Sequence, residues 1–84
     1  DMAFVDGDKR NYTEVYEKLL PIIRSGGYIL ADNTLWDWHV IDPAYDHDHQ
    51  TIGIRQFNDF VAKDDRVEKV ILPLRDGLTL IRKK

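Results

Sequence analysis

The chain has 84 residues, no cysteine and a formal net charge of −3 at pH 7, a size that allows one domain at most. Because acidic and basic residues are interspersed, the charge pattern argues against a nucleic-acid surface and against a polybasic membrane surface. The lack of cysteine excludes a disulfide framework, and no apolar run is long enough to span a membrane. We therefore expect a cytoplasmic protein that binds neither nucleic acid nor membrane.

Two short apolar runs, residues 2–5 and 28–31, flank a segment whose apolar residues recur at helical spacing, about residues 12–24. This pattern predicts a strand, a helix and a second strand. A crossover of this kind is right-handed and makes the two strands parallel neighbours. The carboxyl ends of both strands should therefore lie side by side at one edge of a sheet.

Both ends of the predicted helix carry local signals. Asn11, with Glu14 three residues later, predicts a capping box at its start. Pro21 removes one backbone hydrogen bond and should bend the last turn. Gly26 or Gly27 should then end the helix in a left-handed conformation.

The rest of the chain predicts a loop, a second helix and two further strands. Residues 36–50 are rich in Asp, His and aromatic residues without any period, so we expect a surface loop over the carboxyl edge of the sheet. The helix and the two strands are predicted at residues 51–63, 67–72 and 78–82. Asp76-Gly77 is a favoured hairpin pair and should make a tight connection between the two strands. The predicted fold class is α/β, with parallel strands followed by an antiparallel hairpin and with two main helices.

Oxygen-bearing side chains follow both strands of the predicted parallel pair. Asp6 comes directly after the first strand, and Asp32 and Asn33 come after the second, so all three should lie at the edge where ligands bind in open α/β sheets. Two carboxylates and one amide oxygen suit Mg²⁺, Mn²⁺ or Ca²⁺ better than zinc. The alternative is that Asp6 and Asp32 serve as cap or turn residues, as Asp commonly does after strands. Spacing alone leaves both interpretations open.

Three strings of the sequence add a more specific signal. They are VDGDKRNY at residues 5–12, GGYILADNTLW at residues 26–36 and RDGLTL at residues 75–80. In this order and spacing they closely resemble the C-terminal half of the cation-dependent O-methyltransferases, the family that includes caffeoyl-CoA and catechol O-methyltransferases, and the resemblance runs over essentially the whole chain. It implies the C-terminal half of a Rossmann-like class I methyltransferase fold.

The sequence lacks two features that a complete methyltransferase of this type needs. One is a glycine-rich loop after the first strand, and the other is an acidic residue further on for the cofactor ribose. Gly26-Gly27 follows a helix instead of a strand, so it does not supply that loop. Residues 1–84 are therefore interpreted as the C-terminal part of an O-methyltransferase domain whose N-terminal cofactor-binding half is absent.

The resemblance implies roles for individual residues. Asp6, Asp32 and Asn33 match the ligands of the family's divalent cation, with Mg²⁺ as the first candidate and Ca²⁺ or Mn²⁺ as alternatives. Two vicinal hydroxyls of the acceptor and water would complete the coordination. Lys9 matches a lysine that takes the proton of the acceptor hydroxyl, and a nearby dication favours the neutral amine that a general base requires. The resulting oxygen would attack the methyl group of S-adenosylmethionine.

Three further positions match the family less firmly. Asp8 corresponds to a cofactor contact, although an exposed Asp before a helix is otherwise a cap. Asp37 corresponds to a substrate-side position. Trp36 is either a wall of the substrate pocket or an ordinary core residue. The implied acceptor is a small aromatic molecule that carries a hydroxyl group.

The chain departs from the family pattern at two positions. Trp38 stands where family members usually have glycine, and if that glycine uses a positive φ angle, the tryptophan must strain or redirect the loop. Val15 replaces a tyrosine often found near the cofactor, with Tyr16 one position along. Both departures concern the shape of the pocket and leave the candidate metal ligands unchanged.

The histidines of the loop give no second site. His47 and His49 flank Asp48, with Asp46 nearby, but polar groups in a loop are more often simply solvated than bound to a metal. His39 is interpreted as a loop residue, because the sequence supplies neither an orienting partner nor a nucleophile for it.

Two functions from different classes remain open. In the first, the chain is the metal-binding and catalytic half of an S-adenosylmethionine-dependent O-methyltransferase, inactive by itself, that acts on a catechol-like or hydroxylated aromatic acceptor. In the second, it is a non-catalytic α/β module that self-associates through an exposed strand edge. Without an N-terminal half, the edge of residues 2–5 and the helix face around Tyr12, Tyr16 and Leu19 would be uncovered, so we expect a homodimer or a larger assembly.

Overall fold

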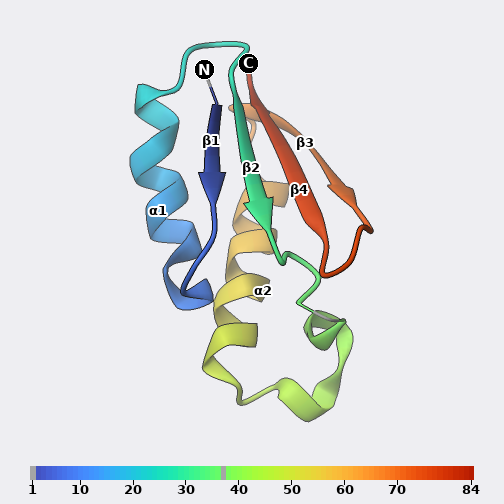
Figure 1. Cartoon of the computed structure of the whole chain (residues 1–84). Helices are drawn as coiled ribbons and strands as arrows, with labels where there is room; N and C mark the ends of the chain where they lie inside the picture. Colours follow the sequence, from blue (N-terminus) through green and yellow to red (C-terminus); the bar gives the residue numbers. More distant parts are fainter. Residues whose placement is uncertain (1, 37) are drawn as a thin grey trace.

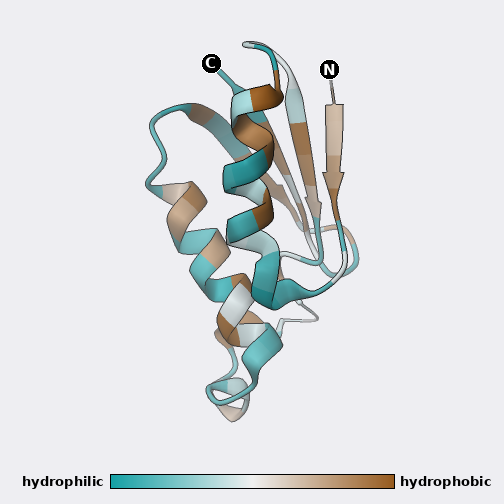
Figure 2. Cartoon of the chain, turned by 90° about the vertical axis from the view of Figure 1, so that its left-hand side faces the viewer, coloured by the Kyte–Doolittle hydropathy of each residue, from teal (hydrophilic) through white to brown (hydrophobic). Residues whose placement is uncertain are grey.

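The computed structural model of the chain describes residues 2–36 and 38–84. In these residues a four-stranded sheet has the strand order β1-β2-β4-β3, and the two α-helices lie on the same side of it (Figures 1 and 2). The elements are β1 (Met2–Val5), α1 (Tyr12–Leu19), β2 (Tyr28–Asp32), α2 (His49–Ala62), β3 (Val67–Leu72) and β4 (Leu78–Lys83). β1 and β2 are parallel, and β4 is antiparallel to both β2 and β3. The α/β class, the parallel pair and the antiparallel hairpin predicted from the sequence are confirmed.

The buried core lies between the helices and one face of the sheet. Tyr12 and Tyr16 of α1 are fully buried and contact Phe57 of α2 edge to face, with ring centroids 5.4 and 5.8 Å apart. Aromatic pairs of this geometry each add about 0.5–1.5 kcal/mol beyond the burial of their area. The expected exposure of this helix face is therefore wrong for Tyr12 and Tyr16, because α2 of the same chain covers both rings.

The start of α1 differs from the predicted capping box. A 3-10 turn, η1 (Lys9–Asn11), precedes the helix, and the Asp8 side chain caps this turn by accepting from the Arg10 amide at 3.0 Å. Asp8 has the extended backbone of an N-cap residue, whereas Asn11 does not and makes no capping side-chain hydrogen bond within the described residues. The capping box at Asn11 and Glu14 is wrong because the chain begins to coil earlier than its apolar pattern indicates.

The end of α1 is also earlier than predicted. The α-helix ends at Leu19 and continues as a 3-10 turn, η2 (Leu20–Ile22), which contains Pro21. Proline has no amide hydrogen to donate into the helix, so the α-helical ladder stops here. The Lys83 amine of β4 donates to the carbonyls of Leu20 and Ile23 at 2.9 and 2.8 Å and so supplies hydrogen bonds at this helix end.

The helix α2 begins two residues before its predicted start. Asp48 is its N-cap, since its Oδ2 accepts from the amide of Thr51 at 2.9 Å and from the hydroxyl of the same residue at 2.6 Å. The preceding loop holds two 3-10 turns, η3 (His39–Ile41) and η4 (Pro43–Tyr45). Arg55 of α2 holds this loop in place. Its guanidinium donates to the carbonyls of His39, Val40 and Asp42 and pairs with the carboxylate of Asp46.

The connection between β3 and β4 is longer than the predicted tight turn. It runs over residues 73–77, and positive φ angles occur at Arg75 (52°) and Gly77 (90°) but not at Asp76. A two-residue turn with Asp-Gly at its centre would need positive φ at both positions. The antiparallel pairing is confirmed, whereas the tight Asp76-Gly77 turn is wrong.

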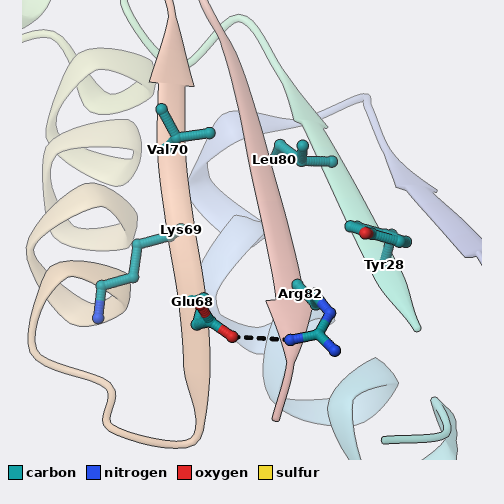
Figure 3. A pocket seen from close by; sticks show the side chains of 6 residues that line it. All are labelled: Tyr28, Glu68, Lys69, Val70, Leu80 and Arg82. Atoms are coloured by element: carbon teal, nitrogen blue, oxygen red, sulfur yellow. Dashed lines mark hydrogen bonds and ion pairs between the residues drawn. The ribbon is translucent and has the colours of Figure 1, made fainter. Parts of the chain in front are cut away.

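The face of the sheet away from the helices is open. The pairing register places Tyr28 and Leu80 on this face together with Val70, opposite the buried Ile29 and Ile81. With Glu68, Lys69 and Arg82 they line a groove of about 300 Å³ (Figure 3).

In the described sheet β1 pairs only with β2, so its other edge is free, as expected. None of the described helices combines the length and the apolar character that a membrane crossing requires.

A buried carboxylate should make the stability of this fold acid-sensitive. Asp64 accepts from the Tyr16 hydroxyl at 2.6 Å and from the Arg66 guanidinium at 2.7 Å, and Arg66 holds the pKa of Asp64 well below its usual range. A depressed pKa in the folded state stabilises the protein above the unfolded value of about 4, and this contribution is lost as the pH falls below it. We expect Asp64→Asn to lower the free energy of unfolding at neutral pH and the deficit to shrink in acid.

Urea unfolding across this pH range tests the prediction, with the exposed neighbour Asp65→Asn as the matched control. A deficit for Asp64→Asn that stays constant from neutral pH to about pH 2 would contradict it, since the native carboxylate would then not be titrating differently from the unfolded one.

Candidate functional site

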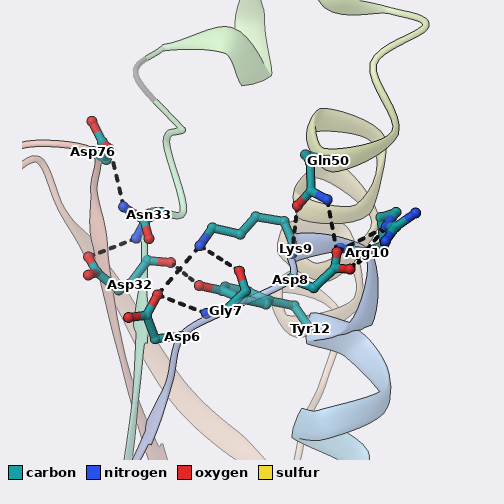
Figure 4. A network of polar contacts seen from close by, with 10 residues as sticks. All are labelled: Asp6, Gly7, Asp8, Lys9, Arg10, Tyr12, Asp32, Asn33, Gln50 and Asp76. Carbon is teal, nitrogen blue, oxygen red and sulfur yellow. Dashed lines mark hydrogen bonds and ion pairs between the residues drawn. The ribbon is translucent and has the colours of Figure 1, made fainter.

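Three predicted ligand residues meet at one end of the sheet. Val5 pairs with Ala31 across the parallel strands, so Asp6 follows β1 beside the end of β2, where Asp32 and Asn33 lie (Figure 4). The Oδ1 atoms of Asp6 and Asp32 each accept the next residue's amide at 2.8 Å. Their Oδ2 atoms accept no hydrogen bond from any described residue. Each carboxylate thus stabilises its turn with Oδ1, and its Oδ2 remains available to bind a cation. The turn interpretation and the metal interpretation are therefore compatible.

Asn33 is held in an uncommon conformation. Its φ angle is 60°, in the left-handed region that Asn tolerates better than most residues. Its side-chain Nδ2 donates to Oδ2 of Asp76 at 3.1 Å. Two carboxylates and one amide therefore gather at the ends of neighbouring strands, a donor set that fits a hard divalent cation. Within residues 2–36 and 38–84 no three His, Cys, Asp or Glu side chains form such a group, so the fit depends on the amide.

Lys9 is buried beside this group. Its amine donates to the Gly7 carbonyl at 2.8 Å and to Oδ1 of Asp6 at 3.5 Å. The same amine lies 5.2 Å from the ring centroids of both Tyr12 and Trp36, a distance at which aromatic faces attract a cation. Only 6% of Lys9 is exposed, so the rings and the loop hold the amine toward Asp6 and keep most water from it.

The N-terminal part of α2 packs against the loop that carries Lys9. A Cβ atom on Gly53 would lie 2.5 Å from the Lys9 carbonyl oxygen, so only glycine allows this approach. Gln50 accepts from the Lys9 amide at 2.8 Å and donates to Oδ1 of Asp8 at 2.9 Å. Sequence reasoning missed both residues, because their role depends on contacts across more than 40 positions.

Asp8 lies on the outer side of the same loop. Its carboxylate receives the Arg10 guanidinium at 3.0 and 2.6 Å, and these hydrogen bonds hold the pKa of Asp8 well below its usual range. The structure thus shows Asp8 acting as the cap of η1, the alternative left open by the sequence, and the implied cofactor contact stays a prediction.

Tyr12 links the helix α1 to the candidate site. Its hydroxyl donates to the backbone carbonyl of Asp32 at 2.8 Å. Burial raises the pKa of Tyr12, so the hydroxyl keeps its proton and remains a donor at neutral pH. The helical spacing of apolar residues predicts only that Tyr12 lies on the buried face of a helix. The signal for a role at the site is its place in the string at residues 5–12, which carries the family resemblance.

The structure shows where most of the remaining pocket and substrate candidates lie. Trp36 packs partly against the core and also contacts the Lys9 amine, so its two interpretations overlap. Asp37 lies outside the described residues. Trp38 keeps a positive φ of 65° and is half exposed, so the tryptophan adopts the backbone that glycine prefers, at a cost of roughly 1–3 kcal/mol. Val15 is partly exposed beside the buried Tyr16.

One histidine of the loop makes a structural contact, and the carboxylates near the other two are engaged in other interactions. His39 stacks on Tyr45 with ring centroids 3.6 Å apart. The two carboxylates beside His47 and His49 serve elsewhere, since Asp46 pairs with Arg55 and Asp48 caps α2.

Known proteins match this chain along its entire length. A family model described as O-methyltransferase matches residues 1–84. The chain is 42% identical over 83 residues to probable caffeoyl-CoA O-methyltransferase 1 of Dictyostelium discoideum, covering 99% of this chain and 36% of the relative. It is 47% identical over 90 residues to caffeoyl-CoA O-methyltransferase 2 of Zea mays, covering 99% and 33%. The crystal structure of an O-methyltransferase from Bacillus cereus in complex with SAH superposes with a TM-score of 0.90 at 31% identity, covering 100% and 40%.

The chain therefore belongs to the O-methyltransferase family, and the resemblance seen in its three sequence strings is confirmed. The four strands and two α-helices of the described residues form part of a Rossmann-like methyltransferase fold. The chain spans about a third of the length of the curated relatives it matches.

Proposed function

We propose that this chain supplies the metal-binding and catalytic half of an S-adenosylmethionine-dependent O-methyltransferase. The acceptor is a catechol-like or hydroxylated aromatic molecule, and a divalent cation, Mg²⁺ first, assists the reaction. The observation that carries the proposal is the convergence of Asp6, Asp32 and Asn33 with the buried amine of Lys9 at one end of the sheet. The named functions of the relatives and the SAH complex of the Bacillus cereus protein support it.

Each residue of the site has one task in this reaction. Asp6, Asp32 and Asn33 would hold the cation through three oxygens. When bound, the cation lowers the proton affinity of the acceptor hydroxyl. Lys9, with its amine in the neutral form, would then take that proton at Nζ as a general base, from a position already 3.5 Å from Asp6. The rings of Tyr12 and Trp36 exclude water and keep the amine directed at the site.

Cation titration of the 84-residue chain tests the proposal. Adding Mg²⁺ or Ca²⁺ should produce saturable amide shifts at residues 6, 32 and 33, with a dissociation constant of roughly 10⁻⁴ to 10⁻³ M for three protein oxygens. Asp32→Ala should remove the shifts, and Asp65→Ala should leave them unchanged. Saturable shifts confined to His47 and His49 would refute the assignment of the site.

The open sheet face supports a second proposal, that the chain self-associates through it and through the free edge of β1. Met2 and Phe4 of β1 are 67% and 57% exposed on this face, and such an edge with an apolar face normally marks an interface. Light scattering over a dilution series should show a dimer or larger species that Phe4→Lys dissociates.

The variant is placed at Phe4 because Val5, on the same strand, is buried and a lysine there would disturb the core. Ile22→Lys is the matched control, since Ile22 is 73% exposed and lies in η2, which is not part of the sheet. A monomer at high concentration, unchanged by Phe4→Lys, would contradict self-association.

A further inference from the structure

We propose that Asp76 is a positioning residue that orients the Asn33 side chain so that the amide oxygen, and not the amide nitrogen, faces the candidate cation site. The inference rests on the proposed function and extends it to a residue 43 positions away in sequence. It starts from one contact, the hydrogen bond of 3.1 Å from Nδ2 of Asn33 to Oδ2 of Asp76, drawn in Figure 4.

The chemistry of this contact decides which way the amide points. An ionised carboxylate can only accept hydrogen bonds, so the atom of Asn33 that faces Asp76 must be the NH₂ group. The amide oxygen then lies on the other side of the planar group. If no acceptor held the NH₂ group, a half-turn of the amide would exchange the two atoms and direct two partly positive hydrogens at a cation. Asp76 excludes that orientation.

Backbone hydrogen bonds fix the position of the chain directly after Asn33. The carbonyl of Asp76 accepts from the amides of Leu35 at 2.7 Å and Trp36 at 2.9 Å, and the Gly77 carbonyl accepts from Thr34 at 3.3 Å. These bonds hold the segment after Asn33 against the loop between β3 and β4.

Two further contacts hold the segment after Asn33 against the loop between β3 and β4. The Asn58 amide of α2 donates to the Thr34 carbonyl at 2.8 Å. Gly77 approaches so closely that a Cβ atom there would lie 2.6 Å from the Leu35 nitrogen, and its φ is +90°. Since the backbone contacts of Asp76 use its carbonyl, a change of its side chain removes the bond to Asn33 and leaves the junction in place.

Two substitutions separate orientation from charge. Asp76→Asn removes the charge but keeps an oxygen that can accept from Asn33, whereas Asp76→Ala removes both. Asp65→Ala is the matched control, because Asp65 is exposed and precedes β3 at the opposite end of the sheet. If Asp76 acted only through its charge, the two variants at position 76 would behave alike.

The first measurement needs no cation. In the 84-residue chain, the Asn33 side-chain NH₂ protons should exchange with solvent more slowly than those of an exposed amide, by nitrogen-edited NMR. The protection should persist in Asp76→Asn and Asp65→Ala and disappear in Asp76→Ala while the backbone amide spectrum stays dispersed. Rapid exchange of the Asn33 NH₂ group in the wild-type chain would overturn the inference.

The second measurement uses Mn²⁺ as the probe, followed by water-proton relaxation. Loss of a partner that orients a metal ligand typically weakens affinity about 10–100-fold, so Asp76→Ala should bind Mn²⁺ about tenfold more weakly than wild type. Asp76→Asn should stay nearer to wild type, and Asp65→Ala should match it. Equal losses in both position-76 variants would overturn the inference. Failure of the wild-type chain to bind Mn²⁺ would refute the cation in the proposed function, while the exchange measurement would still decide the orientation.

Discussion

Methyl transfer by the full-length enzyme is expected to fall to background when Asp32 is replaced by alanine. The change removes a carboxylate that serves twice, since Oδ1 holds the Asn33 amide at 2.8 Å and Oδ2 is the atom left for a cation. Loss of the cation removes the Lewis acid that would favour deprotonation of the acceptor hydroxyl, and the deprotonated oxygen is the nucleophile of the proposed reaction. Single-turnover kinetics at saturating cofactor and Mg²⁺ measure the effect.

Asp32→Asn separates the two tasks of this residue. The amide keeps an oxygen for the bond to Asn33 but loses the charge, so its turn should stay intact while activity is still lost. The Tyr12 hydroxyl binds the Asp32 backbone carbonyl in every variant and helps to keep the strand end in place. A rate above about a tenth of wild type in both variants would exclude Asp32 from the cation site.

Replacing Lys9 by methionine is expected to slow the chemical step by about 10²–10⁴-fold, the usual contribution of a general base. Methionine is long and apolar, so it can fill the space between the Tyr12 and Trp36 rings without leaving a buried charge. Binding of S-adenosylmethionine should change little, because the amine contacts the loop at Gly7 and Asp6.

The split between rate and binding distinguishes this role from a structural one. Single-turnover rates and equilibrium cofactor binding would be measured on the same protein, with thermal unfolding as the check on folding. Small and equal effects of Lys9→Met and Asp32→Ala would refute the assignment of base and ligand. A fall in cofactor affinity as large as the fall in rate would instead give Lys9 a binding role.

The edge of the sheet that carries Asp6 and Asp32 could be predicted because its causes are local. Short apolar runs set where β1 and β2 end, and the handedness of the crossover brings those ends together. The β3 and β4 strands were predicted within one residue for the same reason.

The parts that could not be predicted depend on contacts between distant segments. Nothing in the neighbourhood of Asn33 indicates that Asp76 binds its side chain, because the contact needs the five-residue loop between β3 and β4 instead of the expected tight turn. The burial of Tyr16 likewise depends on Phe57 and Asp64, which lie in later elements. The sequence predicts that Pro21 removes one hydrogen bond and bends the last turn of a helix that runs to about residue 24, whereas α1 ends at Leu19 and Pro21 lies in the 3-10 turn that follows.

The strand order has a consequence for synthesis. β4 lies between β2 and β3 although it comes last of the four strands in the chain, and the loop just before it holds the residues that follow Asn33. A ribosome therefore releases Asp6, Asp32 and Asn33 long before Asp76 emerges, 43 residues after Asn33. A nascent chain that ends before this loop carries every proposed ligand but has no acceptor to orient the amide. We therefore expect the proposed cation site to reach its full affinity only after β4 has paired with β2 and β3.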